Sequence, residues 1–309
     1  MLRNLLIAAL ACPLAPFAMA HDKDTTSPFD PTVQDLTLER GGPPMLGIHW
    51  AREHAANHAR PSKSPVMTYH GGKIMTTAVT QAIFWGPSWA NANFAADKIT
   101  GLDLWYQGHS NSNYAKTVDE YSGSNGTVGA VTTHLDHLID TSTASGGNNT
   151  STILAEVCKV VSSPDSQGNG YYAVYSDVKR GGAQYCAYHS AGTCSGMPVQ
   201  FAFFFNLDGD SGCDPQDTSG QHSQGLAALA NVTAHELAEA RSDPASPGAW
   251  YDSSGAENGD KCAWTFGAPL VTFSNGTQWK LQGEWSNAAY NKGTGYPNSA
   301  GQKGCLSGL

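Results

Sequence analysis

The stretch His235-Glu236-Leu237-Ala238-Glu239 lies near the end of the strongest helical pattern in this sequence, Ser223 to Arg241. Pro244 disfavours helical geometry at Asp243, so we expect the helix to end near Ser242. The small and apolar neighbours of the charged residues indicate a helix covered on most sides, and the alternative is a surface helix with solvated charges. Apolar or small side chains recur at helical spacing at Leu226, Leu229, Ala230, Thr233, Leu237 and Ala240.

The H-E-x-x-E spacing places two metal-binding side chains on one face of this helix. His235 and Glu239 are at i and i+4, about 5–6 Å apart at Cβ, so both can reach one cation. Glu236 is turned about 100° from His235 and can address a water bound to that cation. This is the geometry of H-E-x-x-H zinc peptidases, with a carboxylate replacing the second histidine. We predict that His235 and Glu239 bind Zn2+ and that Glu236 is the general base in hydrolysis of a protein or peptide substrate.

The third metal ligand is expected from the segment that follows the helix, because a catalytic zinc takes three protein ligands and keeps one position for water. Glu257 is the first choice and Asp260 the second, while Asp243 and Asp252 are also close in sequence. A disulfide at Cys262 would tether this loop.

Two further groups contain residue types that bind metals. Asp208-Gly209-Asp210, with Asp214 and Asp217, resembles a loop suited to an additional Ca2+ without matching the EF-hand pattern. His54 and His58 are at i and i+4, where we expect a solvated helix. The alternative is that these two histidines bind the metal in a latent form of the protein.

The beginning of the chain has the features of an exported protein. Residues 1–20 read as a signal peptide, with Arg3 before an apolar segment too short to span a bilayer and Ala18-Met19-Ala20 as the cleavage site. Residues 21–64 are rich in Pro, His and charge and read as a mobile leader or prosegment, with a short helix expected over Ile48 to Arg60. We expect the mature protein to be secreted, with the periplasm as the alternative compartment.

Composition excludes several classes of partner. The chain has 17 basic and 26 acidic residues, a net charge of −9, which becomes −10 when Arg3 leaves with the signal peptide. An acidic chain without a basic run is a poor ligand for nucleic acid or an anionic membrane. No later stretch is long and apolar enough to span a bilayer. We expect a soluble monomer.

The remaining patterns predict an α+β, zincin-like fold, a mixed sheet with an active-site helix, loop-rich and stabilised by disulfides, in a single catalytic domain over residues 65–309. The aromatic strand Val199 to Asn206 is expected beside the cleft, where it would pair with extended substrate. The other expected strands are Val66 to His70, Thr77 to Trp85 and Tyr171 to Ser176, and the other expected helices are Ala90 to Gln107, Ser112 to Tyr121 and Thr152 to Val161.

Six of the seven cysteines remain after Cys12 is removed with the signal peptide, namely Cys158, Cys186, Cys194, Cys213, Cys262 and Cys305. An even number in an exported chain favours disulfides, and the absence of a C-x-x-C pair argues against a thiolate metal site. Spacing does not determine the pairing. The preferred set is Cys262–Cys305 and Cys186–Cys194, which leaves Cys158–Cys213.

The sequence resembles the phosphate-induced protein / Exordium family of plant cell walls over Pro65 to Leu309. The resemblance rests on Tyr69-His70-Gly71-Gly72, Ile83-Phe84-Trp85-Gly86, Cys186-Ala187-Tyr188-His189, the strand ending at Asn206, Cys213, the segment from His235 to Pro244, Ala249-Trp250-Tyr251-Asp252, Glu257 to Cys262, and Cys305. Many plant members lack the His-Glu pair and are associated with growth signalling. This chain therefore resembles a metallopeptidase-like version with an intact H-E-x-x-E motif.

Two other classes of function compete with the peptidase. One is a noncatalytic extracellular or cell-wall-associated module of the Exordium type, in which a metal or the disulfides only stabilise the fold. A structural metal site needs no base beside its ligands, so Glu236 discriminates between the two. The other is a carbohydrate-active enzyme that uses Glu236 and Glu239 as its acid pair, about 5–9.5 Å apart across a sugar cleft.

The cysteine count leads to a first prediction. The mature chain is expected to contain no free thiol, because its six cysteines fold in an oxidising compartment. Alkylation under nonreducing denaturation, followed by mass spectrometry, measures this. Two or more alkylated cysteines would contradict it.

Overall fold

The computed structural model of the chain describes residues 42–58 and 64–309. The predicted signal peptide and the first part of the predicted leader, to residue 41, lie outside the described residues. The central sheet is built from β1 (Leu46–Trp50), β3 (Ala78–Trp85), β6 (Thr132–His134), β7 (Leu138–Asp140), β8 (Gly170–Lys179), β9 (Tyr185–Cys194) and β10 (Met197–Asn206).

This sheet is mixed. Its strand order is β1-β9-β10-β8-β3-β6, with β7 also paired to β3. Strands β10, β8, β3, β6 and β7 pair in parallel, while β9 is antiparallel to both β10 and β1. The predicted mixed sheet is therefore confirmed, and β9 is the strand that runs opposite to both of its neighbours, β10 and the terminal strand β1.

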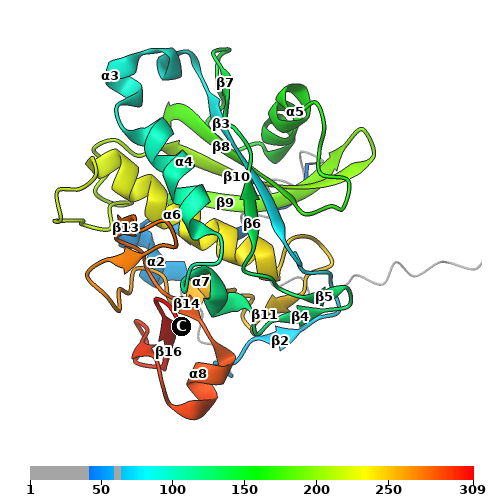
Figure 1. Cartoon of the computed structure of the whole chain (residues 1–309), viewed down its shortest axis with the longest axis vertical. Helices are drawn as coiled ribbons and strands as arrows, with labels where there is room; N and C mark the ends of the chain where they lie inside the picture. Colours follow the sequence, from blue (N-terminus) through cyan, green and yellow to red (C-terminus); the bar gives the residue numbers. More distant parts are fainter. Residues whose placement is uncertain (1–41, 59–63) are drawn as a thin grey trace, which may run out of the picture.

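Helices cover both faces of the sheet (Figure 1). On one face, the Tyr175 hydroxyl of β8 makes hydrogen bonds with Tyr106 at 2.8 Å and Thr233 at 2.9 Å, which belong to α4 and α6. On the opposite face α5 packs against β8, β9 and β10. The helical segments around the sheet are α2 (Arg52–His58), η1 (Pro87–Ala90), α3 (Ala92–Ala95), α4 (Lys98–His109), η2 (Ala115–Val118), α5 (Thr150–Val160) and α6 (Gln224–Ser242).

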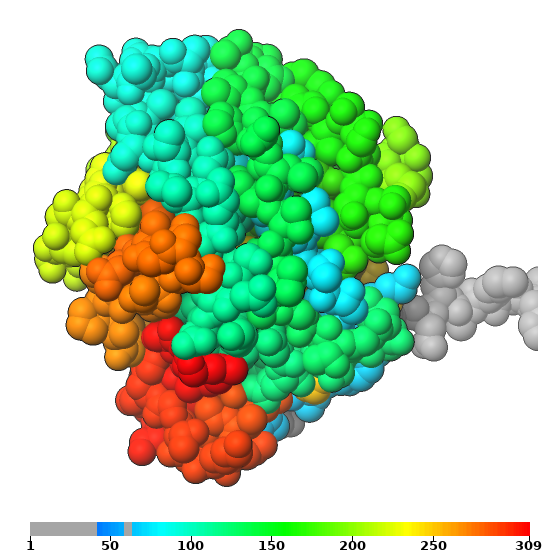
Figure 2. Space-filling view, viewed as in Figure 1, coloured from blue at the N-terminus to red at the C-terminus, as the bar shows by residue number. Residues whose placement is uncertain are grey.

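Helix α6 lies between two hydrophobic cores. The larger core joins the sheet to α4, α5 and α6, and the smaller one gathers Ala238 of α6 with Met67, Tyr121 and Trp285. Figure 1 shows α6 crossing the middle of the molecule, and Figure 2 shows C-terminal residues in orange and red over the lower part of the same face. The lower part contains β2 (Thr68–Tyr69), β4 (Ser122–Gly123), β5 (Gly126–Thr127), β11 (Trp250–Tyr251), α7 (Asn258–Lys261), β12 (Val271–Thr272), β13 (Gln278–Trp279), β14 (Glu284–Trp285), α8 (Asn287–Lys292), β15 (Tyr296–Pro297) and β16 (Lys303–Leu306).

Most long elements agree with the sequence patterns. The strands β3, β8 and β10 and the helices α5 and α6 lie where they are predicted, within a few residues at the ends. The helix expected over Ser112 to Tyr121 is reduced to the 3-10 turn η2. Strand β9 is not predicted, because Tyr185–Cys194 is rich in small residues and lacks the β-branched run that marks its neighbours.

The expectation of a mobile leader over residues 21–64 is wrong for its described part. Leu46–Trp50 forms β1 of the central sheet, and the expected helix begins at Arg52 instead of Ile48 because residues 46–50 are extended. The folded body therefore begins before Pro65.

Strand β10 does not have a free edge for substrate. It pairs with β8 on one side and with β9 on the other, so its backbone groups are already used on both sides. The H-E-x-x-E helix lies beside a different strand, β9. One side of β9 pairs with β10, and the other side pairs with β1.

The described residues contain three disulfides, Cys158–Cys194, Cys186–Cys213 and Cys262–Cys305. The predicted pair Cys262–Cys305 is confirmed. The pairs Cys186–Cys194 and Cys158–Cys213 are wrong, because β9 carries Cys186 and Cys194 at its two ends and holds them apart. None of the described helices is long and apolar enough to cross a membrane.

The Cys186–Cys213 bridge fixes β9 to the loop that follows β10. Replacing both cysteines by alanine is expected to lower the free energy of unfolding by about 3 kcal/mol, because the bridge closes a loop with a sequence separation of 27. Urea unfolding of the double variant measures the loss. Nonreducing digestion of the wild type should yield a peptide pair joined by Cys186–Cys213, and a Cys186–Cys194 pair would contradict the topology of β9.

Candidate metal centre

The H-E-x-x-E motif is buried. The Ser223 side chain caps the start of α6 by accepting a hydrogen bond from the Leu226 amide at 3.2 Å. From Gly225 to Ser242 every residue of the helix is buried, because the sheet packs on one side and the smaller core on the other. The prediction of a helix covered on most sides is confirmed, and the surface-helix alternative is excluded.

His235, Glu239 and Asp260 form one compact group. The Nε2 atom of His235 is 3.1 Å from Glu239 Oε2 and 3.7 Å from Asp260 Oδ1. The other oxygen of Glu239, Oε1, accepts a hydrogen bond from the Asp260 backbone amide at 2.9 Å. One ligand atom from each of these residues lies within 4.8 Å of the others, as binding to a single ion requires.

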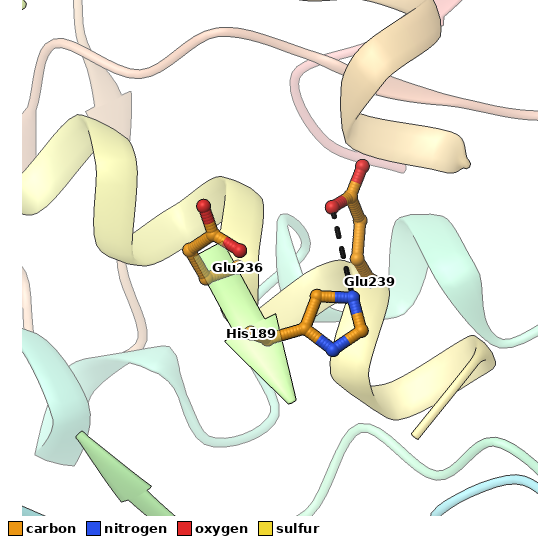
Figure 3. Close-up of side chains that lie close together, drawn as sticks. All are labelled: His189, Glu236 and Glu239. Atoms are coloured by element: carbon orange, nitrogen blue, oxygen red, sulfur yellow. Dashed lines mark ion pairs between the residues drawn. The ribbon is translucent and has the colours of Figure 1, made fainter. Parts of the chain in front are cut away.

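His189 of β9 forms a second group with the same helix. Its Nε2 atom is 3.9 Å from Glu239 Oε2 and 3.4 Å from Glu257 Oε2. Figure 3 shows the His189 ring directed from β9 toward the Glu239 carboxylate of α6, with Glu236 of the same helix nearby. Ligand atoms of His189, Glu236 and Glu239 also lie within 4.8 Å of one another. Glu239 therefore belongs to both groups.

The four carboxylates that the sequence offers as third ligand have different surroundings. Asp260 lies beside His235 and Glu239, whereas Glu257 faces His189. Asp243 accepts a hydrogen bond from the Ala249 amide, and Asp252 pairs with Lys261 Nζ at 2.6 Å. The geometry favours Asp260, the second choice, over Glu257, and assigns Asp243 and Asp252 to the folding of the loop.

The ring of His235 is held by a neighbouring amide. Gln282 Nε2 lies 3.0 Å from His235 Nδ1 and donates to the Gly259 carbonyl at 2.9 Å. Gly259 belongs to α7, where a Cβ atom would lie 2.8 Å from His235 Nδ1. The glycine thus lets α7 approach the ring closely, and Gln282 fixes the ring so that Nε2 faces Glu239 and Asp260. An amide N–H at Nδ1 leaves the ring proton on Nε2, so a metal ion bound at Nε2 would have to displace that proton.

Burial sets the protonation of the cluster. It raises the pKa of Glu239 to about 8, and burial together with the charge of Glu239 raises the pKa of Glu236 well above its usual range. Burial lowers the pKa of His235 to about 4 and, with the nearby His235, lowers that of His189 to about 3. The imidazoles are therefore neutral, which is the form that binds metals, while the carboxyl groups cannot all ionise together without a cation.

Orphaned polar atoms support a cation at this cluster. Buried polar atoms without a hydrogen-bond partner cost free energy, so a native group of them calls for a ligand. His and carboxylate side chains suit zinc. The residues present therefore fit a divalent metal ion. The orphaned atoms of the two groups include His189 Nδ1 and Nε2, His235 Nε2, Glu239 Oε2, and both carboxylate oxygens of Glu236 and Glu257.

The leader contributes a third histidine, His49 of β1. Its ring stacks on His235 with centroids 4.2 Å apart and planes at 12°. His54 and His58, the leader histidines singled out by spacing, lie instead on α2, where His58 stacks on Trp50. The leader therefore reaches the candidate metal centre, but through a different residue.

The acidic loop proposed for calcium does not bring its carboxylates together. Asp208 pairs with Lys98, and Asp210 pairs with Arg180. Asp214 and Asp217 accept backbone amide hydrogens two residues ahead of themselves. Among the described residues, both groups suited to a metal ion lie around Glu239 and neither includes this loop.

His49 and His189 were missed as site residues by sequence reasoning, for one reason. Each is a single histidine on its strand, and the strands β1 and β9 were not predicted. Nothing in the local sequence connects either histidine with α6.

No protein-family model matches this chain, and neither the curated proteins nor the solved structures contain a significantly similar one. What the cluster can do chemically therefore rests on its own residues and their geometry.

The cluster predicts about one zinc per chain. His235→Ala is expected to lose most of the bound zinc, because it removes the nitrogen closest to Glu239 and Asp260. Elemental analysis of protein purified without chelator measures this. His109→Ala is the matched control, because His109 is also fully buried but stacks on Trp105 outside the cluster. A wild-type protein that takes up no transition metal after zinc dialysis would exclude the site.

Proposed function

We propose that this chain is a secreted, zinc-dependent metallopeptidase with a zincin-like fold. The observation that carries the proposal is the pair of buried ligand groups that share Glu239 of α6, one with His235 and Asp260 and the other with His189 and Glu236, beside the strand pair β1 and β9. Three disulfides among the described residues fit an exported protein.

His235, Glu239 and Asp260 would hold the metal. Zinc bound there would lower the pKa of a coordinated water to about 7 and polarise a peptide carbonyl. Gln282 orients the His235 ring, and the Asp260 amide fixes the Glu239 carboxylate. The fold thus aims the remaining His235 nitrogen and Glu239 oxygen at one point.

Glu236 is proposed to hold the proton that water loses during attack on the substrate. Its carboxylate makes no hydrogen bond in the structure and is fully buried. Besides burial, the charges of Glu239 and Asp260 raise the pKa of Glu236, and these are two of the proposed ligands. A general base with a pKa near the working pH is the most effective, so a carboxyl group raised above its usual range suits the role.

His189 is proposed to position the carboxylates from the opposite side. Its neutral ring lies between Glu257 and Glu239, so one N–H can donate to a carboxylate. Because His189 is on β9, next to the edge strand β1, it also connects the cluster with the place where an extended peptide would pair if β1 moved away.

Full burial of the ligands favours a second candidate, a noncatalytic Exordium-like module with a structural metal. His189, His235, Glu236 and Glu239 each have 0% exposure. A closed structural metal site would show the same full burial of its ligands. With the metal on His235, Glu239 and Asp260, Glu236 favours the enzyme, since a structural site of these three ligands gains nothing from a further buried carboxylate beside them.

The conservative variant Glu236→Gln separates these two functions. It is expected to fold, retain zinc and lose hydrolysis of an unfolded protein substrate by about 100-fold or more, because it keeps the side-chain shape and removes the base. His235→Ala should lose both zinc and activity. Because β1 covers the cluster, the assay uses protein cut after folding at a specific protease site engineered over residues 59–63.

Glu156→Gln is the matched control for this substitution. Glu156 is a buried glutamate of α5 that pairs with Lys159 on the other face of the sheet, so its variant should hydrolyse substrate like the wild type. Equal zinc content and equal hydrolysis in wild type and Glu236→Gln would refute Glu236 as the general base. Absence of hydrolysis in the cut wild type would favour the module.

A further inference from the structure

We propose that the outer edge of β9 is the binding site for an extended peptide, and that the leader strand β1 occupies it as an internal inhibitor. The inference rests on the proposed peptidase function and names how its substrate binds. It also assigns Leu46–Trp50 a role that the folding of the sheet alone does not require.

Strand β1 lies where an incoming peptide would pair. Its Leu46 is opposite His189 and its His49 is opposite Ala187, antiparallel to β9. The other edge of β9 is used by β10. Without β1, β9 would present a row of unpaired backbone groups directly beside His189, which is the arrangement that binds extended peptides by strand addition.

Gly47 brings the leader backbone against the ligands. Its φ of +45° lies in the left-handed region, and a Cβ atom there would be 2.0 Å from Glu239 Oε2 and 2.5 Å from the His189 ring. Both contacts are shorter than real Cβ atoms tolerate, so only glycine fits this position. A substrate of this site must also place its peptide backbone in contact with Glu239 and His189, as Gly47 does.

His49 covers the other side of the cluster. Its ring is sandwiched between His235, at 4.2 Å, and Trp264, at 4.6 Å. Both ring nitrogens are buried without a hydrogen-bond partner. The leader therefore contacts the proposed ligands from β1 at two residues, Gly47 and His49.

The leader strand is anchored at both ends. Before β1, the carbonyl of Pro44 accepts a hydrogen bond from Ser190 Oγ at 2.6 Å. After it, the Arg52 amide donates to Gly212 at 2.8 Å, and Arg180 pairs with Glu53 at 2.9 Å. Trp264 Nε1 donates to the Trp50 carbonyl at 2.9 Å. These anchors hold β1 in place without a covalent bond to the body at this edge.

On the side of β9, access to the cluster depends on moving β1. The residues of both ligand groups on α6 and β9 have no exposed surface while β1 is paired, and only Asp260 of α7, at 23% side-chain exposure, reaches the surface. A hollow of about 330 Å³ does adjoin the edge, lined by Pro43, Pro44 and Leu46 with Ala191, Gly192, Thr193, Ala245 and Ser246, but it opens beside the start of β1 and away from Glu236. Substrate and β1 therefore compete for the same edge.

The shape of β1 explains how it can occupy this edge without being a good substrate. The register to β9 shifts between Leu46 and His49, and the left-handed Gly47 lies within that shift. A peptidase that binds its substrate as an added strand needs extended backbone at the scissile bond. The bend at Gly47 removes the extended geometry from the bond nearest the ligands.

Displacing β1 within the full chain tests the inference. Ile48→Asp puts a charge at a side chain that is 8% exposed and packed in the larger core, so β1 should leave the sheet. Amide hydrogen exchange over residues 185–194 is expected to speed up by about 10-fold or more, because the outer edge of β9 loses its partner. Ile48→Val is the matched control and should exchange like the wild type.

A labelled peptide with the sequence of residues 45–51 provides a measurement that does not depend on activity. It should bind Ile48→Asp and not the wild type, as followed by fluorescence anisotropy, and the same peptide with Gly47→Val should not bind. If Ile48→Asp fails to fold, protein cut at residues 59–63 after folding and washed free of the leader fragment replaces it.

The outcomes separate this inference from the proposed function. Peptide binding together with a gain of hydrolysis that the peptide inhibits supports both. Peptide binding without any hydrolysis keeps the edge as a binding site, removes its role as an inhibitor of catalysis, and refutes the peptidase. A folded, zinc-bound Ile48→Asp protein that hydrolyses substrate but neither binds the peptide nor exchanges faster over residues 185–194 overturns the inference and leaves the peptidase intact.

Discussion

The structure depends on bringing carboxyl groups and imidazoles together out of water around Glu239. Each buried carboxylate loses hydration, and each further one repels those already present. The shifted pKa values of Glu239 and His235 express this cost. A fold accepts such a cluster only when the surrounding packing forces it, and here α6 is held between the sheet core and the smaller C-terminal core. Both cores are therefore needed to build one site.

The sheet supplies the second half of that site through one strand of opposite direction. Strands β10, β8, β3 and β6 are parallel, and β9 runs in the opposite direction between β10 and the terminal strand β1. β9 brings His189 to Glu239, and its outer side pairs with β1 next to the cluster. The Cys186–Cys213 bridge ties the same strand to the loop before α6. The position of His189 in the site therefore depends directly on the direction and pairing of β9 in the sheet.

The buried cluster is compatible with both candidate functions, the enzyme and the noncatalytic binding module. A buried metal stabilises a fold whether or not its ligands ever meet a substrate. What distinguishes the two functions is whether the cover can move, and here the cover is β1, a separate strand anchored by side chains such as Ser190 and Arg180. The closed state that resembles a structural site is also the state expected of a latent enzyme.

The sequence by itself determined α6, the shared face of its two potential metal ligands, and the disulfide-bonded state of the cysteines. These features are local: His235 and Glu239 share a face because of helical spacing, and Ser223 and Pro244 bound the helix through their own backbone preferences. The strands β3, β8 and β10 follow from apolar runs for the same reason. Tertiary structure alone decided the approach of Asp260 to His235, the approach of His189, the pairing of Cys186 with Cys213, and the position of His49. The last three depend on strands β1 and β9, whose small and mixed side chains carry little local preference. Their positions are set by pairing with residues far away in the chain, which no local pattern encodes.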